Sequence, residues 1–246
     1  MALAVRDIKL RYRQTMLGVL WVILQPLLAA GVFAFIFGRV AHLDSAGEPY
    51  VLFSYMGLLV WNLFNNSITK AGSALVANAA LVSKIFFPRM LLPFSAIISS
   101  GLDFLIGLAV GFILMLLYGN MPGATLFVAP FWLGLLILFS AGLGLISAAL
   151  AVAYRDVLHV LPVTLQLLLY GSPVAYTISV IPAGLPRTIY RLNPLVPMIE
   201  GFRNAMLGHG FIGFNSAAYG IFAAVTVFVG GLLFFRRMER QFADVI

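Results

Sequence analysis

Six long apolar runs dominate the chain, at residues 17–38, 50–69, 91–118, 125–152, 158–178 and 216–235. A helix needs about 20 mostly apolar residues to cross the hydrocarbon core of a bilayer, and each run reaches that length. Hydrophobic residues make up 62% of the sequence and charged residues only 9%, which is too little polar surface to cover a soluble domain. The sequence therefore predicts an all-α integral membrane protein with six transmembrane helices, in a single domain that comprises residues 1–246.

Basic residues indicate the orientation of these spans, because Lys and Arg collect in cytoplasmic loops. With the N-terminus inside, four of them fall on the outer side, namely Arg39, Arg187, Arg191 and Arg203. The other eleven fall on the cytoplasmic side: Arg6, Lys9, Arg11, Arg13, Lys70, Lys84, Arg89, Arg155, Arg236, Arg237 and Arg240. We therefore expect a multi-pass protein with both termini in the cytoplasm. The same asymmetry accounts for the net charge of +7 without nucleic acid as a partner.

Residues 2–16 precede the first run and carry one apolar stripe at helical spacing. The stripe comprises Val5, Ile8, Tyr12 and Met16. Because Arg6, Arg11 and Arg13 lie off it, the pattern predicts an amphipathic interface helix along the inner leaflet, with its cations near anionic head groups. An unstructured basic flank is the alternative. The first run is longer than a signal-peptide core, which favours a retained span over a cleaved signal.

A second stretch, residues 71–88, is predicted to form a short cytoplasmic helix. Its apolar positions repeat at intervals of four, three and four residues, and Pro88 ends the helix at Phe87 or earlier. These positions are Leu75, Ala79, Val82 and Phe86. Such a helix presents Ile85 and Phe87 on the cytoplasmic side, where a solvated loop would be polar. It either packs under its own bundle or docks into a groove of a partner, and periodicity alone leaves both open.

The outer stretch, residues 179–215, is too long for a tight turn and too apolar for a loop in water. Four prolines divide it: Pro182, Pro186, Pro194 and Pro197. We predict two short re-entrant helices, at about 183–192 and 196–208, that dip into the outer leaflet. Irregular backbone at that depth needs shielding by protein or by a water-filled cavity. A cap over a transport pathway and a purely structural lid both satisfy this requirement.

The sequence lacks the patterns of catalytic, metal and nucleotide sites. His42, His159 and His209 lie far apart, and the eight acidic residues are scattered, so neither a metal site nor a general acid–base pair is expected. No Lys follows a Gly, which excludes a GxxxxGK[ST] phosphate loop. With no cysteine there is no disulfide or thiolate site. We therefore expect no enzyme activity, no metal and no cofactor on this chain.

Two features fall inside the predicted spans. Asp103 lies deep in an apolar run, where a charge is costly and must face protein or a wet cavity. A hydrogen bond to a neighbouring helix is favoured over a proton-coupling role. Gly107 and Gly111 form a GxxxG motif in the same run, which allows close helix approach. The tryptophans near run ends are typical of interface anchors, with core packing as the alternative. These are Trp21, Trp61 and Trp132.

Four stretches resemble, in order, the permease subunits of the ABC-2 transporter superfamily. They are RDIKLRYRQTMLGVLWVILQP at 6–26, VSKIFFPRMLLP at 82–93, AYRDVLHVLPVTLQLLLYGSPVAY at 153–176 and LNPLVPMIEGFRNAML at 192–207. The likeness is greatest to permeases that export O-antigen polysaccharide or teichoic acid. It implies a homodimer of permeases that forms a channel in the bacterial cytoplasmic (inner) membrane. It also implies two separate ATPase subunits that carry ATP and Mg, and a lipid-linked polysaccharide as substrate.

The resemblance also implies roles for particular residues. The ATPase-coupling segment comprises Asn78, Leu81, Val82, Lys84, Ile85, Phe86, Phe87 and Arg89. The interface helix, near which a lipid-linked substrate enters, includes Val5, Arg6, Ile8, Lys9, Tyr12 and Arg13. The family lines its channel with aromatic residues, which makes candidates of Trp21, Phe33, Tyr170 and Tyr176. The fourth-to-fifth cytoplasmic loop contains Tyr154, Arg155 and Asp156.

Three alternatives remain open at this level. An ABC-2 permease for a drug or a lipid shares the same motifs. A stand-alone secondary transporter predicts paired intramembrane charges or inverted repeats, and the sequence displays neither. A membrane-embedded transferase needs clustered acids or histidines, which are also missing from the sequence.

Overall fold

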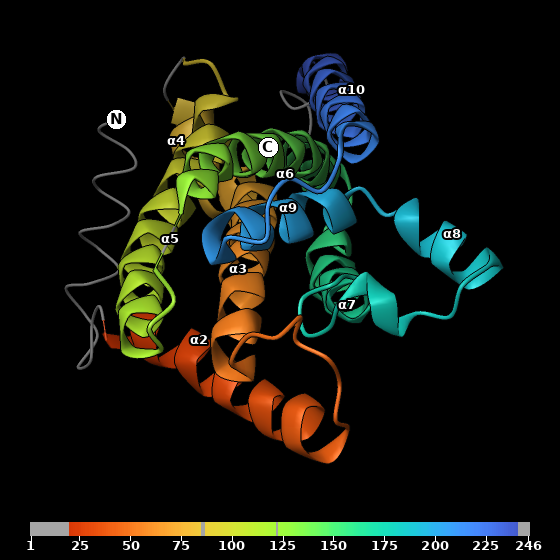
Figure 1. Ribbon diagram of the computed structural model, residues 1–246. Coiled ribbons are helices and arrows are strands. Elements are labelled where there is room, and N and C mark those ends of the chain that lie inside the picture. Colours follow the sequence, from red (N-terminus) through yellow and green to blue (C-terminus); the bar gives the residue numbers. More distant parts are fainter. Residues whose placement is uncertain (1–19, 85–86, 122, 241–246) are drawn as a thin grey trace.

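The computed structural model describes residues 20–84, 87–121 and 123–240, and every regular element among them is helical (Figure 1). The long helices are α2 (Leu20–Phe33, continued by a π-helical stretch at Ala34–Val40), α3 (Tyr50–Ala77), α5 (Leu91–Leu117), α6 (Ala129–Ala153) and α10 (Phe214–Glu239). The shorter ones are α4 (Ala79–Lys84), α7 (Val157–Tyr170), α8 (Leu185–Arg191) and α9 (Leu195–Leu207). Two 3-10 turns, Ala124–Val128 and Ile178–Val180, precede α6 and α8.

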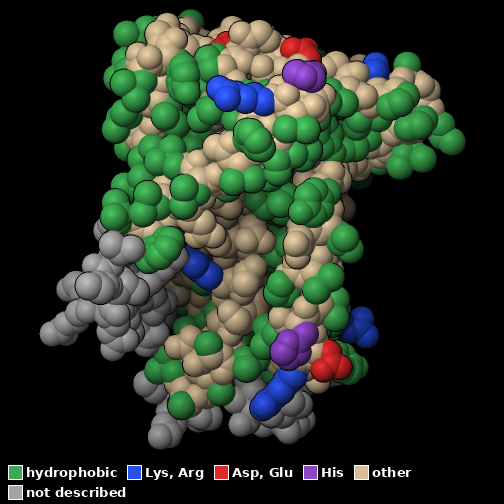
Figure 2. Space-filling model, turned by 90° about the horizontal axis from the view of Figure 1, so that it is seen from below, with side chains coloured by type: hydrophobic (Ala, Val, Ile, Leu, Met, Phe, Trp, Pro, Cys, Tyr) green, Lys and Arg blue, Asp and Glu red, His purple; other side chains and the backbone are tan. Residues whose placement is uncertain are grey.

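Four of these helices are long and apolar enough to cross a bilayer. Among the described residues they are Leu20–Val40, Leu91–Leu117, Ala124–Ala153 and Phe214–Glu239. They correspond to four of the six predicted spans, so the prediction of an all-helical membrane protein is confirmed. Figure 2 shows one face of the molecule, on which the charged and His side chains lie mainly near the two ends. This distribution leaves an apolar middle, as a membrane protein requires.

Helix α3 lies at the centre of the bundle and contacts α2, α5, α6, α7 and α9 (Figure 1). Its 28 residues give it a length of about 42 Å, and its outer half supplies much of the buried core, including Tyr55, Met56 and Phe64. The predicted span ended at residue 69. The helix instead continues to Ala77, because Lys70 finds a partner on α5.

Close packing of α5 against α3 uses the GxxxG motif. A methyl group on Gly111 would lie 3.1 Å from Met56, and one on Gly107 would strike the end of the Leu59 side chain. The Tyr55 hydroxyl donates to the Gly107 carbonyl at 2.7 Å. The small residues therefore serve the α3–α5 contact within this chain, as the motif predicts.

The fifth predicted span, 158–178, is wrong in its last part. Helix α7 ends at Tyr170, and its 14 residues span only about 21 Å, less than the roughly 30 Å of a bilayer core. Gly171 and Pro173 explain the end, because proline has no backbone N–H to continue the ladder and its ring clashes with the preceding turn. The apolar residues beyond it form a turn instead of a helix.

The stretch predicted as one helix at 71–88 divides at Asn78. Residues 71–77 complete α3, and the Asn78 side chain donates back to the Ala74 carbonyl at 2.9 Å. A separate helix, α4, follows at Ala79–Lys84. Ile85 and Phe86 lie outside the described residues, as do the side chains of Val82 and Lys84. So do Val5, Arg6, Ile8, Lys9, Tyr12 and Arg13 of the predicted interface helix.

For two of the three tryptophans the prediction of an interface anchor is wrong. Trp61 is 4% exposed and Trp132 is 1% exposed, both within the main core. Core packing, the alternative, therefore holds for both. Trp21 on α2 is half exposed, as an anchor requires. The two outer helices agree well with prediction, because α8 and α9 begin and end within two residues of the ranges 183–192 and 196–208.

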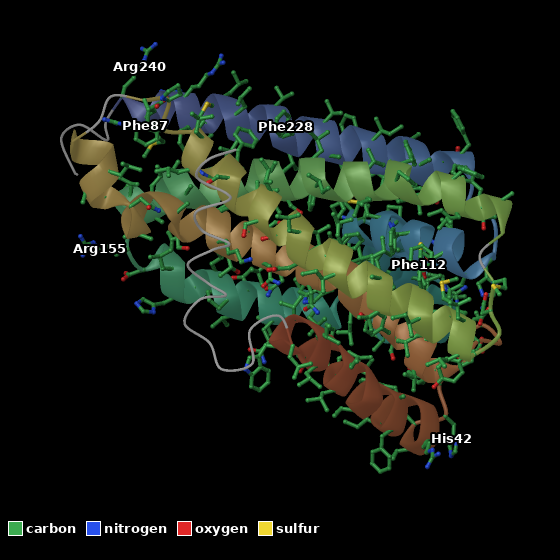
Figure 3. All side chains as sticks on the ribbon, turned by 90° about the vertical axis from the view of Figure 1, so that its left-hand side faces the viewer. His42, Phe87, Phe112, Arg155, Phe228 and Arg240 are labelled. Carbon is green, nitrogen blue, oxygen red and sulfur yellow. The ribbon has the colours of Figure 1, made fainter. Side chains whose placement is uncertain are left out.

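The long helices run side by side along one axis, which gives the molecule two distinct ends (Figure 3). Phe87, Arg155 and Arg240 lie at one end, and His42 lies at the other. We call the first the basic end and, after the orientation predicted from the sequence, the second the outer end. Contacts at the basic end include a hydrogen bond from Arg89 Nη1 to the Glu239 carbonyl at 3.2 Å, which joins the start of α5 to the end of α10.

Candidate functional site

A buried arginine organises the outer end. Arg203 on α9, which the sequence assigned to the outer side, is only 2% exposed. Its Nη1 donates to the Pro173 carbonyl at 2.7 Å and to the Val174 carbonyl at 3.5 Å. Its guanidinium carbon lies 3.8 Å from the centre of the Phe53 ring on α3. Arg203 therefore joins α9, α3 and the turn that follows α7.

The turn after α7, residues 171–176, is held from several sides. The Tyr50 hydroxyl donates to the Ala175 carbonyl, and a methyl group on Gly57 would lie 3.1 Å from the Val174 carbonyl carbon and closer still to its oxygen. Asn193 Nδ2 donates to the Gly171 carbonyl at 2.9 Å and to Ser172 Oγ at 3.0 Å. The break in α7 is therefore a built feature of the fold.

Glu200 stands one helical turn before Arg203 and completes this polar cluster. The two side chains approach to 3.9 Å, and Glu200 Oε1 also accepts from the Ile178 backbone N–H at 3.1 Å. Burial raises the pKa of Glu200, and the Arg203 guanidinium opposes that shift. Burial lowers the pKa of Arg203 to about 10, so the guanidinium stays charged at neutral pH. The sequence signal for this pair was a Glu-x-x-Arg spacing inside a predicted helix.

Two cavities adjoin Glu200 at the outer end. The larger, of 790 Å³, lies among α8, α9 and α10, and the smaller, of 270 Å³, lies on the other side of α9 toward the α2–α3 loop. Ile178 and Glu200 line both. Perturbed acids and bases beside a cavity are a common mark of a binding site.

The four aromatic channel candidates occupy two places. Tyr170 ends α7 and is 60% exposed, and its carbonyl accepts from the Tyr176 hydroxyl at 2.6 Å. Trp21 and Phe33 are on α2, and Phe33 packs edge-on to Phe37 at 5.4 Å. Helices α2 and α7 both contact α3. The structure thus joins Tyr170 to Tyr176 and sets them apart from the α2 pair, and their channel role stays a prediction.

An ion pair crosses the middle of the α3–α5 interface. Lys70 Nζ lies 2.9 Å from Asp103 Oδ2, so the expected hydrogen bond to a neighbouring helix is present. The sequence assigned Lys70 to the cytoplasmic side, just beyond a span that ended at residue 69, whereas the structure places it inside α3. A recess of about 90 Å³ lined by Asn62, Asn66 and Ser100 adjoins Asp103. A second, of 260 Å³, adjoins Lys70.

We expect Asp103→Asn to lower the free energy of unfolding by about 1 kcal/mol, because one interhelical hydrogen bond loses its charge. Export should persist, since the amide still accepts from Lys70. The double variant Lys70→Met/Asp103→Leu is expected to fold about as well as the wild type, because removing both charges avoids an unpaired one. Thermal unfolding in detergent measures the first effect. A correctly folded Asp103→Asn protein without export would contradict a structural role.

At the basic end the coupling residues contact their own bundle. Leu81 and Phe87 are partly buried against a cluster formed by α3, α5, α6 and α10, so packing beneath the bundle accounts for part of this segment. Tyr154, Arg155 and Asp156 are exposed between α6 and α7, and Arg155 lies at the same end as Phe87 (Figure 3).

The described residues form a bundle with four helices able to span a bilayer and two short helices at one end, which defines a multi-pass membrane protein. Residues 1–207 match the ABC-2 type transporter family, and the chain belongs to that family.

Individual relatives cover nearly the whole chain. The O-antigen export system permease protein RfbA of Klebsiella pneumoniae is 29% identical over 242 residues, which are 98% of this chain and 92% of that protein. The corresponding protein of Myxococcus xanthus is 30% identical over 85% of this chain and 80% of its own length. The polysialic acid transport protein KpsM of Escherichia coli is 31% identical over 97% of this chain and 93% of its own length.

Family membership also decides how the Lys70–Asp103 pair is interpreted. A stand-alone secondary transporter would need paired intramembrane charges, and the structure supplies one such pair. The match to an ABC-2 family over residues 1–207 outweighs that single feature, so the pair is assigned to helix packing.

Proposed function

We propose that this chain is the permease subunit of an ATP-driven exporter of polysaccharide in the bacterial inner membrane. The observation that carries the proposal is the near full-length similarity to permeases named for O-antigen export and for polysialic acid transport. One name specifies export and the other transport, and both refer to a polysaccharide. The substrate we propose is such a polymer attached to a lipid carrier.

The proposed membrane arrangement is one domain, residues 1–246, with six crossings and both termini in the cytoplasm. Helix α3 supplies one of the two further crossings, because it lies among the apolar helices and contacts α2, α5 and α6. Helix α7 with its following turn supplies the other. Arg155 and Arg240 lie at the same end of the molecule (Figure 3). Because basic residues collect on the cytoplasmic side, this supports the assignment of that end to the cytoplasm.

The proposed assembly has two copies of this chain and two ATPase subunits. The sequence has no phosphate-binding loop of its own, which is consistent with ATP and Mg bound on the partner. Docking is assigned to the segment from Asn78 to Arg89, because it connects α3 to α5 at the basic end. Trp21, Phe33, Tyr170 and Tyr176 remain the proposed channel residues.

The continuity of α3 provides a route for coupling. This helix runs without interruption from Tyr50, which bonds to the turn after α7, to Ala77, which adjoins the docking segment. If closure of the ATPase displaces α4, helix α3 therefore moves with it as a rigid body. The far end of α3 contacts the turn after α7. Transport requires that the docked segment bind the two ATPase states with different free energies.

Charge reversal at Lys84 and Arg89 tests the docking assignment. We expect the double variant to retain about a tenth or less of the ATPase that copurifies with the wild type, because two contacts at about 1 kcal/mol each are lost. The measurement is stoichiometry after affinity purification in mild detergent. Arg236→Glu, at the same end but on α10, is the matched control and should retain the ATPase. Undiminished copurification of a folded double variant would contradict the assignment.

A further inference from the structure

The two outer cavities lie on either side of Glu200. The carboxylate lines both of them and is 16% exposed. On the side of the larger cavity it is joined by Arg191, Asn215, Ser216 and Tyr219. Their combined volume, on the order of a thousand Å³, is large enough for a small ligand. The cavities are therefore of a size to hold one or two sugar rings.

The lining has the chemistry of a site for hydroxyl groups. A sugar hydroxyl both donates and accepts, so its site needs acceptors and donors close together. Glu200 supplies a carboxylate acceptor, Asn215 and Ser216 supply groups of both kinds, and Arg191 supplies donors. The exposed Phe214 and the Tyr219 ring give apolar faces for the C–H side of a sugar. This mixture suits a glycan better than a lipid tail.

The polar groups of the smaller cavity are held in place before any ligand arrives. Glu200 Oε1 is fixed by the Ile178 N–H, and Arg203 is fixed by the Pro173 carbonyl. Within the described part of the chain, the buried Nε of Arg203 has no hydrogen-bond partner, and Arg203 lines this cavity. A buried donor without a protein acceptor calls for an explanation, and an oxygen atom of a bound ligand in this cavity provides one.

We propose that the cavities on either side of Glu200 bind a sugar unit of the exported glycan at the outer face. This inference rests on the proposed function. The site is separate from the four aromatic channel candidates, yet it adjoins one of them, because Tyr176 precedes Thr177 in the cavity wall. In the proposed route the glycan passes Tyr170 and Tyr176 before Glu200, and the site holds the emerging glycan while the transporter resets.

Blocking the cavity with a bulky side chain tests the proposal without removing a structural contact. Ser216→Trp on α10 fills the larger cavity, and Val225→Trp, exposed on the same helix away from it, is the matched control. The permease–ATPase complex in nanodiscs is mixed with oligosaccharide repeats released from the surface polysaccharide of its host. Saturation-transfer NMR then measures binding. We expect the signal to vanish in Ser216→Trp and to persist in Val225→Trp.

Glu200→Gln tests the chemistry, since it keeps the size and the Ile178 contact but removes the charge. We expect roughly tenfold weaker binding. Because the variant also leaves Arg203 without its carboxylate, near-UV circular dichroism first checks that the complex is folded and assembled. Unchanged binding in both Ser216→Trp and Glu200→Gln overturns the site. So does the absence of binding by a wild-type complex that exports polymer, and in that case the proposed function stands. A complex that shows no ATP-dependent polysaccharide export overturns the proposed function. The NMR binding measurement then decides independently whether the site binds sugar.

Discussion

Replacement of Arg203 by methionine is expected to lower the free energy of unfolding by about 3–5 kcal/mol, the cost of removing one partner from a buried charge pair. Methionine fills much of the same volume, so the loss is electrostatic. Glu200 would remain 16% exposed with its nearby cation gone. The Pro173 carbonyl would also lose a donor at 2.7 Å. The stacking on Phe53, worth about 2 kcal/mol when desolvated, disappears as well.

Thermal unfolding of the purified permease in detergent, followed by near-UV circular dichroism, measures this loss. Arg191→Met is the control, because Arg191 is exposed on α8 and should change the stability by less than about 1 kcal/mol. Arg203→Lys should fall between the two, since an ammonium keeps the charge but lacks the planar guanidinium, whose Nη1 reaches two carbonyls while Nη2 faces Glu200. Equal stability of Arg203→Met and wild type would contradict the claim that Arg203 stabilises the packing of α9, α3 and the turn after α7.

The contrast between Arg203 and its surroundings shows what the sequence could and could not predict. The two outer helices were predictable, because prolines and apolar spacing are local signals. The burial of Arg203 was not, because its acceptors at Pro173 and Val174 lie about 30 residues away. Those carbonyls are free to accept only because α7 ends at Tyr170, an end that apolar composition alone conceals.

Contacts between residues far apart in the sequence also explain why the end of α3 was predicted wrongly. The apolar run ends before Lys70, so the sequence predicted a span that stops there. The partner that keeps Lys70 in a helix, Asp103, is 33 residues away, and only helix packing brings the two together. Trp61 and Trp132 were likewise placed by their distance from run ends, whereas their burial depends on which helix face meets the core.

The candidate outer site was the least accessible to prediction. Its polar groups come from α8, α9 and α10, and in the sequence they are single polar residues among apolar ones. Their spacing matches no motif. The sequence analysis did not single out Glu200 and Arg203, although their Glu-x-x-Arg spacing puts two opposite charges one helical turn apart.

The second large effect is expected where α6 and α10 meet through their backbones. A methyl group on Gly142 would lie 2.6 Å from the Val227 carbonyl carbon, and one on Gly231 would lie 2.9 Å from the Gly142 carbonyl carbon. The obstructing atoms are backbone, which cannot rotate away as a side chain does. Gly142→Ala and Gly231→Ala must therefore push the helices apart, and each should cost about 3 kcal/mol, at the upper end for overpacking.

Neighbouring glycines provide matched controls for this prediction. Gly230, adjacent to Gly231 on α10, and Gly134, two turns before Gly142 on α6, have open space where a methyl group would go. Alanine at either should be neutral or stabilising by up to about 1 kcal/mol, because alanine favours the helix. The double variant Gly142→Ala/Gly231→Ala should cost less than the sum of the single changes, since both separate the same contact. Equal unfolding temperatures for Gly231→Ala and Gly230→Ala would show that α6 and α10 are not in backbone contact. The expected difference instead places the backbones of α6 and α10 in direct contact at Gly142 and Gly231.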